Sequence, residues 1–203
     1  MKKLLLILAF ILFGTIVNAQ EYEIWGTFKI AGKLNDKWKV EMEGEDRYNF
    51  TEYEIRYFHF DIGAIYSLGE RFGVGLFYRD IFGHKGDDYI KSTVPHLDFF
   101  YSAPSGFKIR MRHEYIIIYD NFNSYRFRLR PGFQTKWFKN FNPFIQDEIF
   151  IAEVDDLSRN RLNAGVTIKL GKFSIQPGYL LESNHKSDWS HRNILWVNTK
   201  VKF

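Results

Sequence analysis

Hydrophobic and polar residues alternate along most of this chain, and the alternation is clearest between residues 125 and 137. One parity carries Tyr125, Phe127, Leu129, Pro131, Phe133 and Trp137, and the other carries Arg126, Arg128, Arg130, Gln134 and Lys136. Because successive side chains of a β-strand point to opposite faces, this pattern predicts a strand with an aromatic face and a cationic face. A soluble sandwich would bury the aromatic face in a core, whereas a membrane barrel would turn it toward lipid.

Similar patterns recur along the rest of the chain, separated by turn signals. The expected strands cover residues 25–31, 38–50, 53–68, 72–80, 94–101, 107–119, 125–137, 143–152, 161–170, 173–181 and 193–203. Within 53–68 the apolar parity changes near Phe58, which predicts a bulge or a tilt of the strand out of the lipid zone. No linker or low-complexity tract divides the strands, so we expect one domain.

The connections between these strands fall into two alternating sets. Short ones cover residues 67–71, 103–106, 138–142 and 170–172, and longer polar ones cover residues 83–92, 120–124, 153–160 and 183–191. Short periplasmic turns and longer extracellular loops are typical of outer-membrane barrels. Together these patterns predict an all-β fold: an antiparallel transmembrane β-barrel, an up-and-down meander of about 10–12 strands.

The strand at 25–31 makes the count uncertain. Ten strands follow from Trp38 onward, and bacterial single-chain barrels have even strand numbers. The first segment is therefore expected either to pair as a partial strand at the seam or to reflect a missed division. The expected number is accordingly ten or twelve.

The N-terminus has the pattern of a secretory signal peptide. Lys2 and Lys3 precede an apolar run at 4–17 that is too short to span a bilayer, and Val17-Asn18-Ala19 fits a cleavage site after Ala19. We therefore expect a signal peptide at 1–19, a barrel domain at 20–203 and export to the cell outer membrane.

The last strand supports the same location. Its apolar residues occupy every second position and end at Phe203, a pattern that predicts recognition by the outer-membrane assembly machinery. The expected partners are this machinery and outer-membrane lipid, and the barrel is expected to be a monomer.

Composition fits such a barrel and excludes several function classes. Aromatic residues make up 19% of the chain although no later segment is apolar enough for a spanning helix, as expected when half of each strand faces lipid. The formal charge of +4 includes two lysines of the signal peptide and is too small to indicate a nucleic-acid partner. The absence of cysteine excludes disulfides and a lipoprotein anchor. No pattern indicates a cofactor or a metal. The five tryptophans lie near predicted strand ends, where interfacial aromatic girdles belong: Trp25, Trp38, Trp137, Trp189 and Trp196.

Placing the polar parity inside the barrel gathers a network of charges in the lumen. Its expected members are Glu41, Glu43, Arg47, Arg79, Arg110, Arg112, Glu114, Arg126, Arg128, Arg130, Glu148 and Arg161. In a narrow barrel these side chains should pair with one another and largely fill the interior, giving a structural barrel. The functional alternative is a narrow, anion-preferring pore or binding cavity, in which Arg126, Arg128 and Arg130 would be the main residues.

Two further functions stay open. A lipid-modifying hydrolase would need a histidine–acid pair, and the weak candidates are His59 with Asp61 and His96 with Asp98, which share a strand face. Neighbouring residues such as His113 and Glu114 face opposite ways, and no serine has a recognisable nucleophile context. The other alternative is a soluble periplasmic β-barrel or β-sandwich that binds a ligand.

Several of these features together resemble one family. They are the strand at Trp25 followed by the segment 37–43 and Arg47, the segments 63–68 and 75–79, the triplet 112–114, the three arginines at 126–130, Asp147-Glu148 and Arg161. The chain resembles the exported β-barrel family termed domain of unknown function 2490, which is typical of Bacteroidetes. The resemblance extends over essentially the whole mature chain. It implies an outer-membrane location and supplies no established activity.

Overall fold

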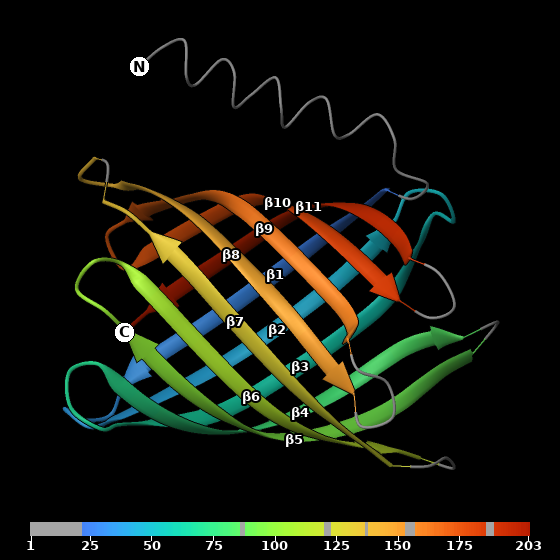
Figure 1. The fold of residues 1–203 in the computed structure, drawn as a ribbon, viewed down its shortest axis with the longest axis horizontal. Helices are drawn as coiled ribbons and strands as arrows, with labels where there is room; N and C mark the ends of the chain where they lie inside the picture. The colour runs from blue at the N-terminus through green and yellow to red at the C-terminus, as the bar shows by residue number, and fades with distance from the viewer. Residues whose placement is uncertain (1–21, 86–87, 120–122, 137, 153–156, 186–188) are drawn as a thin grey trace, which may run out of the picture.

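The computed structural model describes residues 22–85, 88–119, 123–136, 138–152, 157–185 and 189–203. Over these ranges the chain forms eleven strands in a single closed sheet (Figure 1). The strands are β1 (Tyr22–Lys33), β2 (Trp38–Asn49), β3 (Glu54–Ser67), β4 (Phe72–Lys85), β5 (Asp88–Ser102), β6 (Phe107–Ile118), β7 (Ser124–Gln134), β8 (Phe141–Ala152), β9 (Leu157–Leu170), β10 (Phe173–His185) and β11 (Trp189–Lys202). The predicted signal peptide and Trp137 lie outside the described residues. In the described part, the chain has no helix long and apolar enough to cross a membrane, a finding that concerns helices only.

The predicted meander barrel is confirmed, and its seam explains the odd first strand. Each strand pairs antiparallel with the next, and β1 closes the barrel by pairing parallel with β11, from Tyr22 opposite Asn193 to Ala31 opposite Lys202. Eleven strands lie within the expected range of about 10–12, but the expectation of an even number is wrong. Because the seam is parallel, an odd number of strands can close. The first strand is a complete member of the wall, with a full ladder to β2 as well.

Short turns define one rim of the barrel, here called the C-terminal rim. The turns at 34–37, 68–71, 103–106 and 171–172 lie there together with Phe203, whose backbone amide donates to the Ala31 carbonyl. Gly69, Gly106 and Gly171 have positive φ values of 91°, 97° and 65°, a conformation that other residues rarely adopt. These glycines allow tight reversals at this rim.

At the opposite rim the connections are shorter than the sequence predicts. The expected loop at 83–92 is mostly strand, because β4 continues to Lys85 and β5 begins at Asp88, with His84 paired to Tyr89. The expected loops at 153–160 and 183–191 are shortened in the same way by β9, β10 and β11. Backbone pairing continues here through polar residues, which hydropathy alone marks as loop. The predicted irregularity near Phe58 is confirmed as a register shift, where Arg47 faces Tyr57 and Tyr48 faces Ile55.

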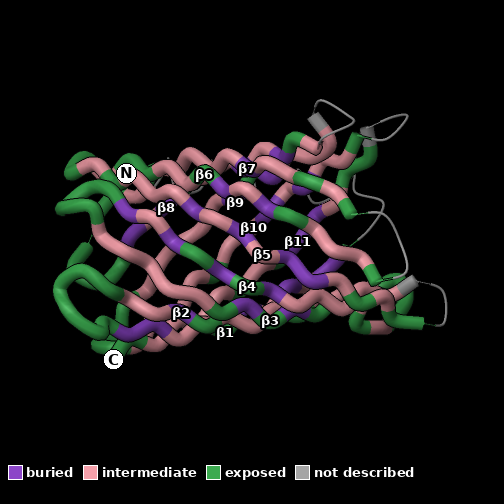
Figure 2. Tube along the Cα trace, turned by 90° about the horizontal axis from the view of Figure 1, so that it is seen from below, coloured by how far each residue is buried: buried purple, intermediate pink, exposed green. Residues whose placement is uncertain are grey.

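Burial is inverted relative to a soluble protein. The buried residues are mostly charged or amide side chains, whereas large apolar side chains such as Phe28, Leu76 and Leu195 are exposed. Figure 2 shows buried positions recurring along the strands between exposed ones, as alternation between lumen and outer surface requires. The outer wall is therefore apolar and the interior is polar.

The tryptophans only partly follow the predicted girdle. Trp38 is exposed on the outer wall, whereas Trp25 and Trp196 lie inside the barrel, where they pack with Leu180 and Ile194. The girdle prediction is wrong for Trp25 and Trp196, because nearness to a strand end says nothing about which face a side chain takes. Their indole N–H groups donate to Glu23 Oε2 (2.7 Å) and Thr27 Oγ1 (3.2 Å) inside the barrel.

Candidate functional site

Strand alternation sends charged side chains of β1 to β11 into the lumen, and Glu114 of β6 lies at the centre of the largest group. This carboxylate is completely buried and accepts hydrogen bonds from Arg126 Nε (2.6 Å) and Arg128 Nη1 (2.7 Å). Arg112 Nη1 and Arg79 Nη1 lie 3.7 and 3.8 Å from its Oε1 atom. One carboxylate thus balances guanidinium groups from β4, β6 and β7.

Two neighbouring carboxylates extend this group along the wall. Glu148 of β8 accepts from Arg110 Nη2 (2.6 Å) and Arg128 Nη2 (2.8 Å), so Arg128 bridges two strands. Asp98 of β5 accepts two hydrogen bonds from Arg112, both of 2.7 Å, in the fork geometry that suits a carboxylate. The ion pairs therefore form a continuous network over β4 to β8.

His96 and Asp98, one of the two histidine–acid pairs considered for hydrolysis, belong to the same network. His96 lies between two carboxylates, with Nδ1 3.0 Å from Asp98 Oδ1 and Nε2 3.2 Å from Asp61 Oδ2. The Phe77 ring stacks on the imidazole at 4.9 Å, and the His96 side chain is fully buried. Asp61 also accepts from Arg79 Nη2 at 2.5 Å. His96 thus links two ion pairs and does not face a cavity.

A second group lies on the opposite side of the lumen, on β1 to β3. Lys29 Nζ lies 2.6 Å from Glu43 Oε2, and His59 Nε2 lies 3.4 Å from Glu43 Oε1. Arg47 donates to Glu45 from Nε (2.8 Å) and Nη2 (2.6 Å). This group therefore presents carboxylates that already have cationic partners.

Aromatic rings separate several of these cations. The Arg47 guanidinium lies 3.8 Å from the Trp25 ring and 3.9 Å from the Tyr57 ring. Buried Phe150 lies under Arg128 and Arg161, at 4.6 and 4.8 Å. Such cation–π contacts hold guanidinium groups in place without neutralising their charge.

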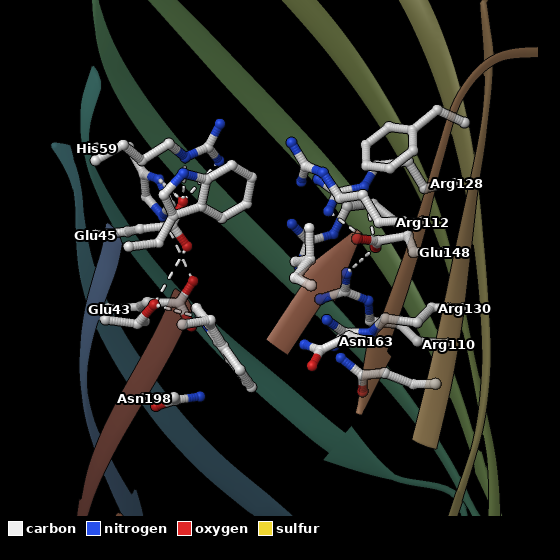
Figure 3. Close-up of a pocket in the computed structure, with 18 of the residues that line it drawn as sticks. Glu43, Glu45, His59, Arg110, Arg112, Arg128, Arg130, Glu148, Asn163 and Asn198 are labelled. Atoms are coloured by element: carbon white, nitrogen blue, oxygen red, sulfur yellow. Dashed lines mark hydrogen bonds and ion pairs between the residues drawn. The ribbon is translucent and has the colours of Figure 1, made fainter. Parts of the chain in front are cut away.

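Between the two groups lies a central cavity of about 230 Å³ (Figure 3). Among the described residues that line it, three are carboxylates (Glu43, Glu45 and Glu148) and ten are cationic: Lys29, Arg47, Arg79, Arg110, Arg112, Arg126, Arg128, Arg130, Arg159 and Arg161. In Figure 3, Glu43, Glu45 and His59 face the arginine cluster across the open space. The cavity wall is therefore strongly cationic on one side.

A second cavity, of about 370 Å³, lies at the C-terminal rim. Its lining contains no carboxylate from the described residues and five lysines: Lys108, Lys169, Lys172, Lys200 and Lys202. Gln176 and Asn198 line both this cavity and the central one, so the two adjoin. A small solute at this rim would meet cationic side chains first and the central arginines next.

One group of side chains has the composition of a metal site. Glu43, His59 and Asp61 bring possible ligand atoms within 4.8 Å of one another. However, Lys29 already binds Glu43, and Arg79 already binds Asp61. These two cations would repel a metal ion, so the geometry favours an ion-pair junction.

All twelve residues predicted for the lumen network lie on the inward parity of their strands. Eleven of them form at least one ion pair within 4 Å, while Arg130 forms none with any described residue. Their role in transport or binding stays a prediction, as does the assembly role of Phe203. Phe203 itself is exposed on the outer wall.

Sequence reasoning missed several members of these groups: Glu23, Lys29, Glu45, Arg159, Glu182 and Lys200. Glu45 shares the parity of Glu43 and Arg47 and could have been found from it. Glu182 was missed because the predicted strand ended one residue before it, although it binds Arg161 Nε at 2.7 Å. Glu23 and Lys29 lie on the seam strand, whose place in the barrel the sequence left open.

Comparisons with known proteins give a family and solved structures of similar fold. The model of a family described as protein of unknown function (DUF2490) matches residues 22–192. No curated protein matches the chain. A solved structure with a similar fold is the translocator domain of autotransporter NalP from Neisseria meningitidis, with 9% identity, a TM-score of 0.46, and coverage of 79% of this chain and 73% of that chain.

Proposed function

The chain belongs to the DUF2490 family of proteins of unknown function, and we propose that it is an integral outer-membrane barrel whose narrow lumen passes small anions. The observation that carries this proposal is the cationic lining of the two adjoining cavities. Rings of arginine and lysine favour anions in pores, because they replace the favourable interactions an anion loses on leaving water.

The outer wall supports the membrane part of the proposal. Exposed apolar side chains cover it, and aromatic pairs lie near its C-terminal rim, where Trp38 contacts Tyr66 and Phe72 contacts Tyr101, each at 5.0 Å between ring centroids. An apolar band between aromatic girdles is the surface that a bilayer requires of a β-barrel. In water the same surface would be an aggregation hazard.

The first prediction concerns ion selectivity. In a planar bilayer under a potassium chloride gradient, the purified barrel is expected to conduct in small steps. The sign of the reversal potential should show that chloride permeates more easily than potassium. Replacing Lys169 and Lys202 with glutamate should weaken this preference, because it reverses two charges of the rim cavity. Lys139→Glu changes the same charge outside the cavities and serves as the control. A folded sample that shows no conductance, or that prefers potassium, would contradict the proposal.

The second prediction concerns assembly. Phe203 ends a strand with apolar residues at every second position, and its exposed ring lies on the outer wall. Phe203→Ala is expected to lower the folded, heat-modifiable fraction in outer-membrane preparations several-fold, because the ring belongs to the proposed assembly signal. Phe50→Ala removes an exposed aromatic ring from the opposite rim and should leave assembly unchanged. If both variants assemble to the same extent, Phe203 is not part of an assembly signal.

A further inference from the structure

We propose that Arg110 and Arg130 form a binding site for a tetrahedral oxoanion of the phosphate class. The proposal deepens the anion path described above and rests on it only for the route of entry.

Two like charges face each other across neighbouring strands of the barrel wall. Arg110 and Arg130 are register partners on β6 and β7, so two guanidinium stems lie directly opposite each other on the lumen face. Like charges opposite each other in a sheet are destabilising unless something balances them. The adjacent partners Arg112 and Arg128 show the balanced case, because Asp98 binds Arg112 and Glu114 binds Arg128.

Arg110 and Arg130 lack this balance. Glu148 accepts a hydrogen bond from Arg110, and this carboxylate is already shared with Arg128. Arg130 has no hydrogen bond or ion pair to any residue in the described ranges. A guanidinium in the interior of a barrel needs an anionic partner, since leaving it unpaired is costly. Among the described residues, Arg110 and Arg130 therefore have too little negative charge beside them to balance both guanidinium groups.

Unused hydrogen-bond donors point to the same place. Arg110 Nε and Arg112 Nη1 are buried and have no hydrogen-bond acceptor among the described residues. Arg112 Nη1 lies 3.7 Å from Glu114 Oε1, which is beyond hydrogen-bond distance. All three arginines line both the central cavity and a smaller adjoining one of about 60 Å³. The described lining of the smaller cavity also includes four carboxylates, each of which already has a cationic partner: Glu41, Glu43, Asp61 and Asp98.

An oxoanion fits this donor set better than chloride does. Each guanidinium offers parallel N–H groups in a planar fork, which match two oxygens of phosphate at once. Arg110 and Arg130 lie side by side at the cavity (Figure 3), and Asn163 lines the same cavity. Asn163 of β9 also lines the central cavity, and its side-chain amide N–H groups can donate to an oxygen of the ion. The site therefore has donors for several oxygens of one ion.

The route to this site passes the lysines of the C-terminal rim. A cavity of about 170 Å³ is lined by Lys108 and Gln134, which also line the rim cavity, and by Arg110 and Arg130. No carboxylate of the described residues lines this cavity of about 170 Å³, so an anion drawn to the rim would reach Arg110 and Arg130 without passing one. Phosphate could come from a free ion or from a lipid headgroup, and both supply the same chemistry.

Calorimetric titration of the folded protein in a phosphate-free detergent tests the site. One arm uses inorganic phosphate and the other a soluble short-chain phosphatidic acid, so that the responding arm identifies the source. Arg130→Gln is expected to weaken binding about tenfold or more, the scale of one lost bidentate charge-assisted contact. Arg130→Lys keeps the charge but loses the fork, and it should bind more weakly than the native protein. Arg71→Gln removes an arginine from an exposed turn and should bind as the native protein does.

Stability gives an independent readout. Without phosphate, Arg130→Gln should unfold no more easily than the native barrel, because it removes a like-charge contact and breaks no ion pair. If neither phosphate compound binds, or if Arg130→Gln binds equally well, the site is refuted. The binding assay needs no conductance: a barrel that conducts chloride without binding phosphate refutes only this site. A barrel that binds phosphate without conducting refutes only the pore.

Discussion

Replacing Glu114 with glutamine is expected to lower the free energy of unfolding by about 3–5 kcal/mol, the scale for removing one partner of a buried ion pair. The carboxylate is fully buried, and its two shortest contacts are to Arg126 and Arg128. Without its charge, these guanidinium groups face Arg112 and Arg79 with too little negative charge between them. Urea unfolding in phospholipid vesicles, followed by tryptophan fluorescence, measures the change.

Two further variants make the Glu114 result specific. Glu70→Gln removes the same charge from an exposed turn and should change stability by less than about 0.5 kcal/mol. Adding Arg126→Gln to Glu114→Gln should recover part of the loss, because it removes one of the cations left without a partner. A loss below about 1 kcal/mol for Glu114→Gln would mean that the network does not stabilise the barrel.

The strands were predictable because one physical rule governs them. A barrel wall with an apolar outer face and a polar lumen demands a period of two, and the sequence keeps this period along most strands, with one shift in β3. Tyr125 to Arg130 illustrate it, since their parity alone places the arginines inside. The limits of β4 and β5 were missed because backbone pairing continues at the rim through polar residues, which hydropathy does not mark as strand. The parallel seam was missed because pairing between the first and last strands leaves no local pattern.

The sequence predicted which charged residues face the lumen, but not which of them form ion pairs with one another. Parity placed Arg110, Arg128 and Arg130 on the same side of the wall, yet it could not say which of them has a carboxylate. That depends on register across three strands, which brings Glu148 to Arg110 and Arg128 and leaves Arg130 without an ion-pair partner among the described residues. The burial of Trp25 could not be predicted for the same reason. It depends on the pairing of β1 with β11 at the seam, which no local sequence pattern shows. Chemistry that depends on such differences needs the structure.

Leu195→Arg is expected to destabilise the barrel in a bilayer by about 2–4 kcal/mol, the range for an arginine placed on the lipid face near mid-depth. Leu195 lies near the middle of β11, and 55% of its surface is exposed on the outer wall. In a soluble protein, an arginine at so exposed a position would be harmless, because it would be hydrated. In lipid the guanidinium must lose its water or distort the bilayer. The loss can be measured by urea unfolding in vesicles, so this substitution separates a membrane barrel from a soluble one.

Leu34→Arg is the matched control for this prediction. Leu34 is 65% exposed, slightly more than Leu195, but it lies in the turn at 34–37 on the C-terminal rim. An arginine there reaches water, so the expected change is about 0–1 kcal/mol. The difference between the two variants therefore reports depth in the bilayer rather than the loss of a leucine. If both variants unfold like the native protein, the outer wall does not face lipid, and a soluble periplasmic barrel becomes the better interpretation.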